Sequence, residues 1–158
     1  MATFVDRYPD ESKVIQATFA VAFISLGIGA LFGVIQALHR TNVFRFIDSV
    51  DYYTLLTGHG VLLALVFTIF FLAGVFQWGV TESLDTPASD IRLTWAWFGL
   101  MTAGATFAAV AILAGLFPEI PMSADVLYTF YAPLQAHPLF YAGLAMFIVG
   151  TWISGADW

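Results

Sequence analysis

The sequence predicts an all-α protein, a polytopic transmembrane helical bundle of about four spans. Only 10% of its 158 residues are charged and 60% are hydrophobic, whereas soluble domains carry about 25% charged residues. Nearly all of the hydrophobicity lies in four segments, at 14–38, 53–80, 93–117 and 139–156. A helix needs about 20 apolar residues to cross the hydrocarbon core of a bilayer, and the length of each segment is close to this value.

Charged residues and prolines avoid these segments. All 11 acidic residues, all 5 basic residues and all 6 prolines lie outside them. An unpaired charge is costly in the bilayer, and a proline leaves a backbone carbonyl without its hydrogen bond. We therefore expect a single membrane domain over residues 1–158, with its four spans in contact with the lipid bilayer.

Each span has a distinct composition. The first contains "GALFG", in which Gly29 and Gly33 have the spacing of small residues at close helix–helix contacts. The second carries His59, an ionisable residue in an otherwise apolar stretch. The third, "TAGATFAAVAILAG", is rich in small residues and is expected to be a packing surface. The fourth follows Pro138.

Several functions are excluded by composition. The chain has no cysteine, which excludes disulfides, thiolate metal sites and cysteine nucleophiles. Its net charge of −6 lies in short loops, so a nucleic-acid partner is not expected. No phosphate loop, Ser–His–Asp arrangement or pair of buried carboxylates is present, and no catalytic residue is assigned within this chain.

The order of the spans assigns loops to two membrane faces. The N-terminus, the loop at 81–92 and the C-terminus share one face. The loops at 39–52 and 118–138 share the other. With three basic residues against two, the first face is favoured as cytoplasmic. All five tryptophans fall on that face and are interpreted as an interfacial aromatic belt: Trp78, Trp95, Trp97, Trp152 and Trp158.

His59 is the candidate ligand of a cofactor. A helix that starts near Tyr53 places it roughly 9 Å inside the membrane boundary. Gly58 and Gly60 leave the backbone bare on both sides, as a haem bound edge-on to the helix requires, and haem iron commonly takes a histidine as axial ligand. An apolar wall for the macrocycle is expected from the following residues on the same helix face: Leu62, Leu63, Val66 and Phe70.

A structural role for His59 is the alternative from the residues alone. In it, the imidazole is hydrogen-bonded to a neighbouring helix and the glycines serve close packing. The other two histidines, His39 and His137, lie at span ends, where solvated side chains are expected. A second axial ligand from His137 stays open.

Three stretches resemble one known family. "GALFGVIQAL", "YYTLLTGHGVLLALVFTIFF" and "VLYTFYAPLQAHPLFYAG" together resemble subunit I of haem–copper terminal oxidases, most closely the B-family cytochrome c oxidases. The resemblance extends over roughly residues 14–153. It implies that this chain is the four-helix, N-terminal part of a subunit of twelve or more helices, or a truncated copy that needs a partner.

The resemblance also implies cofactors and partners. His59 would be an axial ligand of the low-spin haem, the site's only metal ligand in this chain, and Tyr128 and Tyr131 would help to cover that haem. The high-spin haem, the copper and their ligands would belong to later helices. The implied partners are those remaining helices of subunit I, a copper-bearing subunit II, and cytochrome c or a small copper protein as electron donor.

The implied activity is that of a cytochrome c oxidase, an oxidoreductase of the respiratory chain. Electron transport to O2 is coupled to proton transport across the plasma membrane of a prokaryote. Two competing interpretations are a stand-alone four-helix cytochrome b, with His59 and His137 as paired ligands, and a haem-free structural bundle. Reduction of nitric oxide in place of O2 is a further alternative within the family.

Overall fold

The computed structural model describes residues 3–41, 49–88, 90–117, 119 and 136–157. Within these ranges the regular elements are all helical, which confirms the predicted all-α class. In chain order they are α1 (Phe4–Arg7), α2 (Pro9–Arg40), α3 (Ser49–Gly60), the π-helix η1 (Val61–Phe67), α4 (Thr68–Leu84), α5 (Ile91–Leu113), the 3-10 helix η2 (Ala114–Leu116) and α6 (Pro138–Asp157).

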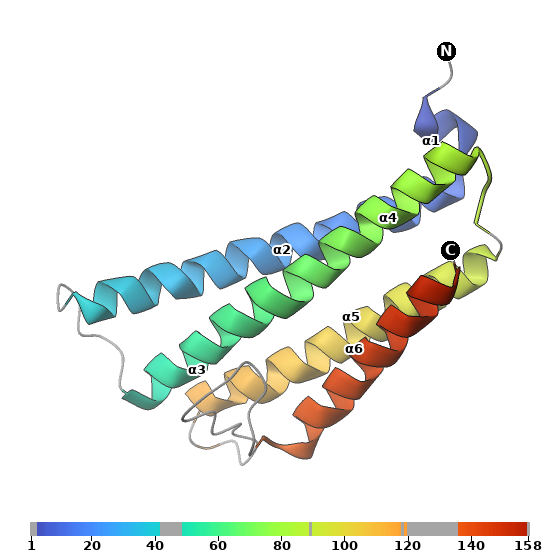
Figure 1. Ribbon diagram of the computed structural model, residues 1–158. Coiled ribbons are helices and arrows are strands. Elements are labelled where there is room, and N and C mark those ends of the chain that lie inside the picture. The colour runs from blue at the N-terminus through green and yellow to red at the C-terminus, as the bar shows by residue number, and fades with distance from the viewer. Residues whose placement is uncertain (1–2, 42–48, 89, 118, 120–135, 158) are drawn as a thin grey trace.

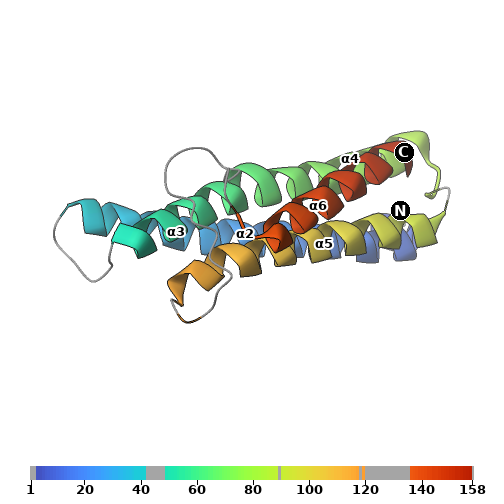
Figure 2. The ribbon, with the colours of Figure 1, turned by 90° about the horizontal axis from the view of Figure 1, so that it is seen from below.

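Four helical stretches are long and apolar enough to cross a membrane: Pro9–Arg40, Tyr52–Leu84, Ile91–Leu113 and Pro138–Asp157. Figures 1 and 2 show them side by side in alternating directions, with the N- and C-terminal ends of the chain at the same end of the bundle. The first stretch begins and ends in polar residues such as Glu11 and Arg40. It therefore extends beyond the purely apolar segment 14–38.

The bundle is built from two helical hairpins. α2 packs along α3, η1 and α4, and α5 packs along α6. The hairpins meet where α5 contacts α2 and α3 and where α4 contacts α6. Large side chains from several helices are fully buried between them: Trp97, Phe70, Phe140, Met101 and Ile112.

α5 and α6 approach each other through glycines. A Cβ atom on Gly104 would lie 2.5 Å from the carbonyl oxygen of Gly143, and one on Gly150 would lie 3.0 Å from the backbone nitrogen of Met101. No side chain fits at these distances. The small residues of the third span thus form a packing surface, as the sequence predicts, and α6 is the helix that they contact.

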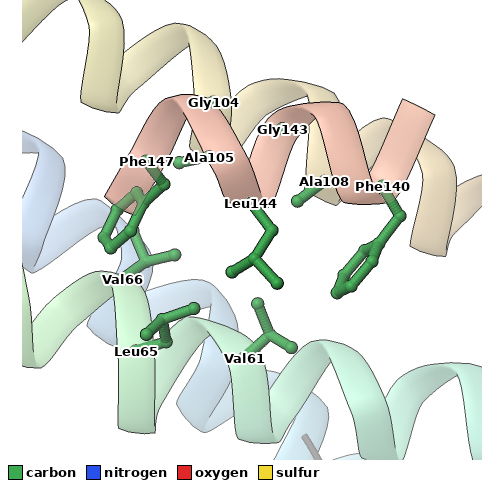
Figure 3. Close-up of a pocket in the computed structure, with 10 residues that line it drawn as sticks. All are labelled: Val61, Leu65, Val66, Gly104, Ala105, Ala108, Phe140, Gly143, Leu144 and Phe147. Carbon is green, nitrogen blue, oxygen red and sulfur yellow. The ribbon is translucent and has the colours of Figure 1, made fainter. Parts of the chain in front are cut away.

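A narrow apolar cavity lies where the second span faces α5 and α6. Figure 3 shows Leu144 and Phe147 of α6 directed toward Val61, Leu65 and Val66 of η1. Gly104 and Gly143 border the same cavity. The inward face of η1 is therefore used for contact between the two hairpins.

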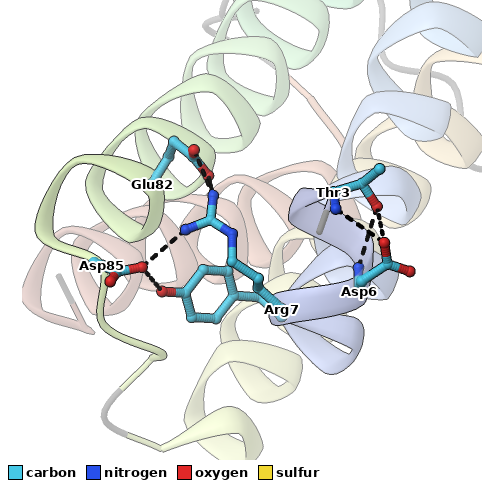
Figure 4. A network of polar contacts seen from close by, with 6 residues as sticks. Thr3, Asp6, Arg7, Glu82 and Asp85 are labelled. Carbon is cyan, nitrogen blue, oxygen red and sulfur yellow. Dashed lines mark hydrogen bonds and ion pairs between the residues drawn. The ribbon is translucent and has the colours of Figure 1, made fainter. Parts of the chain in front are cut away.

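The N-terminal helix is bound to the end of α4 by a polar network (Figure 4). The Arg7 guanidinium donates to Glu82 Oε2 at 2.6 Å and to Asp85 Oδ1 at 2.8 Å, and the Tyr8 hydroxyl donates to the same Asp85 oxygen at 2.6 Å. The Tyr8 hydrogen bond, followed by the charge of Arg7, lowers the pKa of Asp85, and the bond to Asp85 raises the pKa of Tyr8. These contacts join α1 to the start of the α4–α5 connection.

The tryptophans are not all interfacial. Trp78, Trp95 and Trp152 are exposed, as expected for a belt, but Trp97 is fully buried. Its indole Nε1–H donates to Asp157 Oδ2 at 3.2 Å. The prediction that Trp97 belongs to the belt is wrong, because a buried carboxylate from α6 gives the indole a polar partner inside the bundle. Trp158 lies outside the described residues.

Gly104→Ala is expected to destabilise the bundle by about 1–3 kcal/mol, the usual range for overpacking, because its Cβ would meet the backbone of α6. Gly99→Ala on the same helix is the matched control, since its Cβ would meet nothing within 4 Å. Reversible unfolding in detergent measures both. Equal stability of the two variants would contradict the close α5–α6 contact.

The N-terminal network is expected to loosen at both extremes of pH. Asp85 has a lowered pKa in the folded protein, so its contribution is present above the ordinary value of 3.8 and is lost as the pH falls below it. Tyr8 has a raised pKa, so its contribution is present below 10.0 and is lost as the pH rises further. Amide exchange of residues 3–8, corrected for intrinsic rates, measures both limits.

Asp85→Asn should accelerate this exchange at neutral pH. Asp10→Asn is the control, because Asp10 pairs with Lys13 within α2 and not with α4. An Asp85→Asn variant with unchanged exchange would contradict the role of the network.

Candidate functional site

His59 lies near the end of α3, two residues before η1 begins, and its side chain is half-buried. Its Nδ1 atom is 2.8 Å from the backbone carbonyl oxygen of Gly29 in α2. A carbonyl oxygen can only accept, so Nδ1 carries the proton and donates. In the neutral imidazole this leaves the lone pair on Nε2, and none of the described residues forms a hydrogen bond with that atom.

Gly33 provides the space in which the imidazole lies. A Cβ atom at this position would be 2.8 Å from Cε1 and 3.0 Å from Nδ1 of His59. One turn earlier, a Cβ on Gly29 would be 2.7 Å from Cδ2 of Leu63. The two glycines therefore allow close helix contact, as predicted, and Gly33 in particular accommodates the candidate ligand.

The glycines beside His59 are both buried. A Cβ on Gly58 would lie 2.9 Å from the ring of Phe32 in α2, so this glycine has a packing role. Gly60 ends α3 with helical backbone angles and leads directly into η1. The helix thus remains continuous through the histidine.

The π-helix divides the expected apolar wall between two faces. Leu62 and Leu63 lie against Gly29 of α2. Val66 instead borders the cavity with α5 and α6, and Phe70 packs on Phe147 of α6 with ring centroids 5.9 Å apart. The prediction of one continuous face is wrong, because i→i+5 hydrogen bonding in a π-helix changes the direction of successive side chains.

A buried glutamine strengthens the contact between α2 and α3. Gln36 is 6% exposed, and its Nε2 donates to the carbonyl oxygen of Leu55 at 3.0 Å. This bond lies one turn of α3 before His59 and so helps to hold the histidine against α2. The sequence contained a signal for it, since Gln36 is one of only two amide side chains in the first apolar segment, 14–38.

The other histidines lie apart from this arrangement. His39, expected to be solvated, is half-buried against Tyr52 with ring centroids 5.5 Å apart, and its buried Nδ1 has no hydrogen-bond partner among the described residues. His137 stands just before α6, where its Nδ1 accepts from the Leu139 backbone at 3.2 Å. Tyr128 and Tyr131 lie outside the described residues.

The residues around His59 fit an axial ligand of a haem iron. The ring is oriented through one nitrogen, and the other keeps its lone pair. Ligating histidines commonly donate their second ring nitrogen to a carbonyl in this way, which fixes the tautomer. Among the described residues no group of three or more His, Cys, Asp or Glu side chains could enclose a bare metal ion. A haem needs only an axial bond from each side, and a single histidine supplies one.

Asp157 is a polar residue that the sequence did not single out. It directly follows the fourth apolar segment, 139–156, but in the structure it lies within α6 and is 7% exposed. Its Oδ2 accepts from the Thr94 hydroxyl at 2.7 Å and from Trp97 at 3.2 Å. No local pattern distinguishes it from the other carboxylates outside the apolar segments, because its partners Thr94 and Trp97 are 63 and 60 residues away in the chain.

Comparisons with known proteins identify the family of this chain. The family model described as "Cytochrome C and Quinol oxidase polypeptide I" matches residues 13–157. A cytochrome c oxidase subunit 1 from Thermus thermophilus is 34% identical over 158 aligned positions, which cover 94% of this chain and 26% of that relative. The chain thus spans about a quarter of the length of this curated relative. On these matches, the chain belongs to the cytochrome c and quinol oxidase polypeptide I family and is a multi-pass membrane protein.

Proposed function

We propose that this chain is the N-terminal part of the haem-binding core subunit of a respiratory terminal oxidase, which transfers electrons to O2 and couples this transfer to proton translocation. Its own contribution is one axial ligand of the low-spin haem, the Nε2 atom of His59. The observation that carries the proposal is the 2.8 Å contact between His59 Nδ1 and the Gly29 carbonyl oxygen. Family membership supports the wider oxidase role.

The Gly29 carbonyl positions His59 and adjusts its electronic character. Because it accepts a hydrogen bond from the Nδ1–H group, it limits rotation of the ring and makes Nε2 more electron-rich. A bound haem supplies one-electron redox chemistry, and its potential depends on its axial ligands and on their hydrogen bonds. The protein therefore acts on electron transfer through the orientation and basicity of one imidazole.

Glycines give this imidazole its space. Gly33 leaves room for the ring itself, and Gly58 and Gly60 keep the backbone beside the ligand free of side chains. Leu62 and Leu63 belong to the apolar surroundings of the site. Together these residues give the ligand apolar surroundings, and in a medium of low polarity nearby dipoles act on it more strongly.

Partners follow from the single ligand. The complete subunit needs further helices to supply the second axial ligand of the low-spin haem and the ligands of the high-spin haem and the copper. A copper-bearing subunit II receives electrons from cytochrome c or a small copper protein. We place the chain in the plasma membrane of a prokaryote with a cytoplasmic N-terminus, as the slight excess of basic residues on that face favours.

A stand-alone cytochrome b with paired His59 and His137 ligands is not favoured. In neutral His137, the Nδ1 atom accepts a hydrogen bond, so Nε2 carries the proton and has no lone pair for a metal. This contact lies at the start of α6, so rotation of the His137 ring would leave the Leu139 backbone N–H without its hydrogen-bond acceptor.

His59→Ala is expected to abolish the six-coordinate low-spin haem spectrum of the complete subunit, purified from membranes, because no other described histidine presents a free nitrogen at that place. His137→Ala is the control and should retain the spectrum. Reduced-minus-oxidised absorption spectra measure both. Retention of the low-spin signal in His59→Ala would refute ligation, and loss of it in both variants would support the cytochrome b alternative.

Gly33→Ala should weaken haem retention by roughly 10- to 100-fold, the usual effect of disturbing a residue that supports a metal ligand. Its Cβ would lie 2.8 Å from the imidazole and would force the ring to shift. Gly27→Ala in the same helix is the matched control, since its Cβ would meet nothing within 4 Å. Haem titration with each variant gives the comparison. Equal retention by the two would show that Gly33 does not position His59.

A further inference from the structure

A second polar site lies at the opposite end of the second span from His59. Here α4 and α6 end near the loop at 84–88, and a cavity of about 210 Å³ lies between them. Gln77, Thr81 and Asp157 contribute polar side chains to its lining. The candidate haem ligand plays no part in this cavity.

Gln77 is buried without partners for its amide. Its side chain is 2% exposed, and neither Oε1 nor Nε2 forms a hydrogen bond with the described residues. A buried polar group left unpaired is strongly disfavoured, and most such groups are bonded to protein or to ordered water. The amide therefore needs a molecule in the cavity that both donates and accepts.

Asp157 also lines this cavity, and one of its carboxylate oxygens is unpaired. Its Oδ2 receives the hydrogen bonds of Thr94 and Trp97, whereas its Oδ1 is buried and has no partner among the described residues. These two bonds hold the carboxylate in place from the α5 side. They leave Oδ1 available to a donor in the cavity.

The chemistry of these three atoms selects the ligand. Gln77 Oε1 and Asp157 Oδ1 require donors, and Gln77 Nε2 requires an acceptor. A bare cation would leave Nε2 unpaired, and an anion would leave both oxygens unpaired. Water satisfies all three, and the cavity is large enough for several molecules, each of which needs about 10–15 Å³.

We propose that Gln77 and Asp157 bind a cluster of ordered water molecules that joins α4 to α6. The cluster links the two hairpins at the end of the bundle where direct contact between α4 and α6 is sparse. Gln77 holds it from the second span, and Asp157 holds it from the fourth, through a carboxylate already oriented by α5.

The first test is a structure of the unmodified protein in nanodiscs at a resolution that shows water. The expected result is density for water within hydrogen-bond distance of Gln77 Oε1, Gln77 Nε2 and Asp157 Oδ1. A metal ion, a side chain from another helix, or a direct Gln77–Asp157 bond in a closed cavity would each overturn the proposal.

The second test is a double-mutant cycle in unfolding with Gln77→Met and Asp157→Asn. Two residues joined through water should be coupled, and their combined effect should differ from the product of the single effects by more than about threefold in the unfolding equilibrium constant. Gln77→Met with Thr151→Val is the control pair, because the Thr151 hydroxyl bonds within α6 to Phe147. Additive effects for Gln77 and Asp157 would overturn the proposal.

Discussion

The close approach of α2 to the second span determines where the candidate ligand lies. In a bilayer, burial of apolar surface between helices gives little net gain, so close packing and hydrogen bonds must hold the helices together. Gly29 and Gly33 allow this packing, and the Gly29 carbonyl adds a hydrogen bond to His59. The same two residues thus bring the helices together and orient an imidazole.

This arrangement combines the two roles that the sequence left as alternatives. His59 is hydrogen-bonded to a neighbouring helix, as a structural histidine would be, and Gly58 serves packing against Phe32. The bond uses only Nδ1, however, and a structural bond at that atom is what prepares Nε2 for a metal. The structural contact therefore does not compete with ligation.

The fold class could be predicted because charges and prolines are excluded from the apolar segments by simple energetics. His59 could be found because it is the only histidine within them. Its contact with Gly29 could not be predicted, since spacing within one helix does not reveal which partner helix its face meets. Trp97 was misassigned and Asp157 was not singled out for the same reason, because the hydrogen bond between them joins residues that are 60 positions apart in the sequence. A uniformly apolar stretch also gave no sign of η1.

The π-helix has a consequence for the comparison of related chains. Its wider turn accommodates the equivalent of one additional residue, which in an ordinary α-helix corresponds to a rotation of about 100°. Deletion of a single residue between Val61 and Phe67 would therefore convert the wide turn to an ordinary α-helical turn, with His59 still facing α2 and α4 still facing α6. An alignment with a related chain that has an ordinary α-helix here should therefore place a one-residue gap within η1, so that the positions upstream and downstream are compared on the same helix faces.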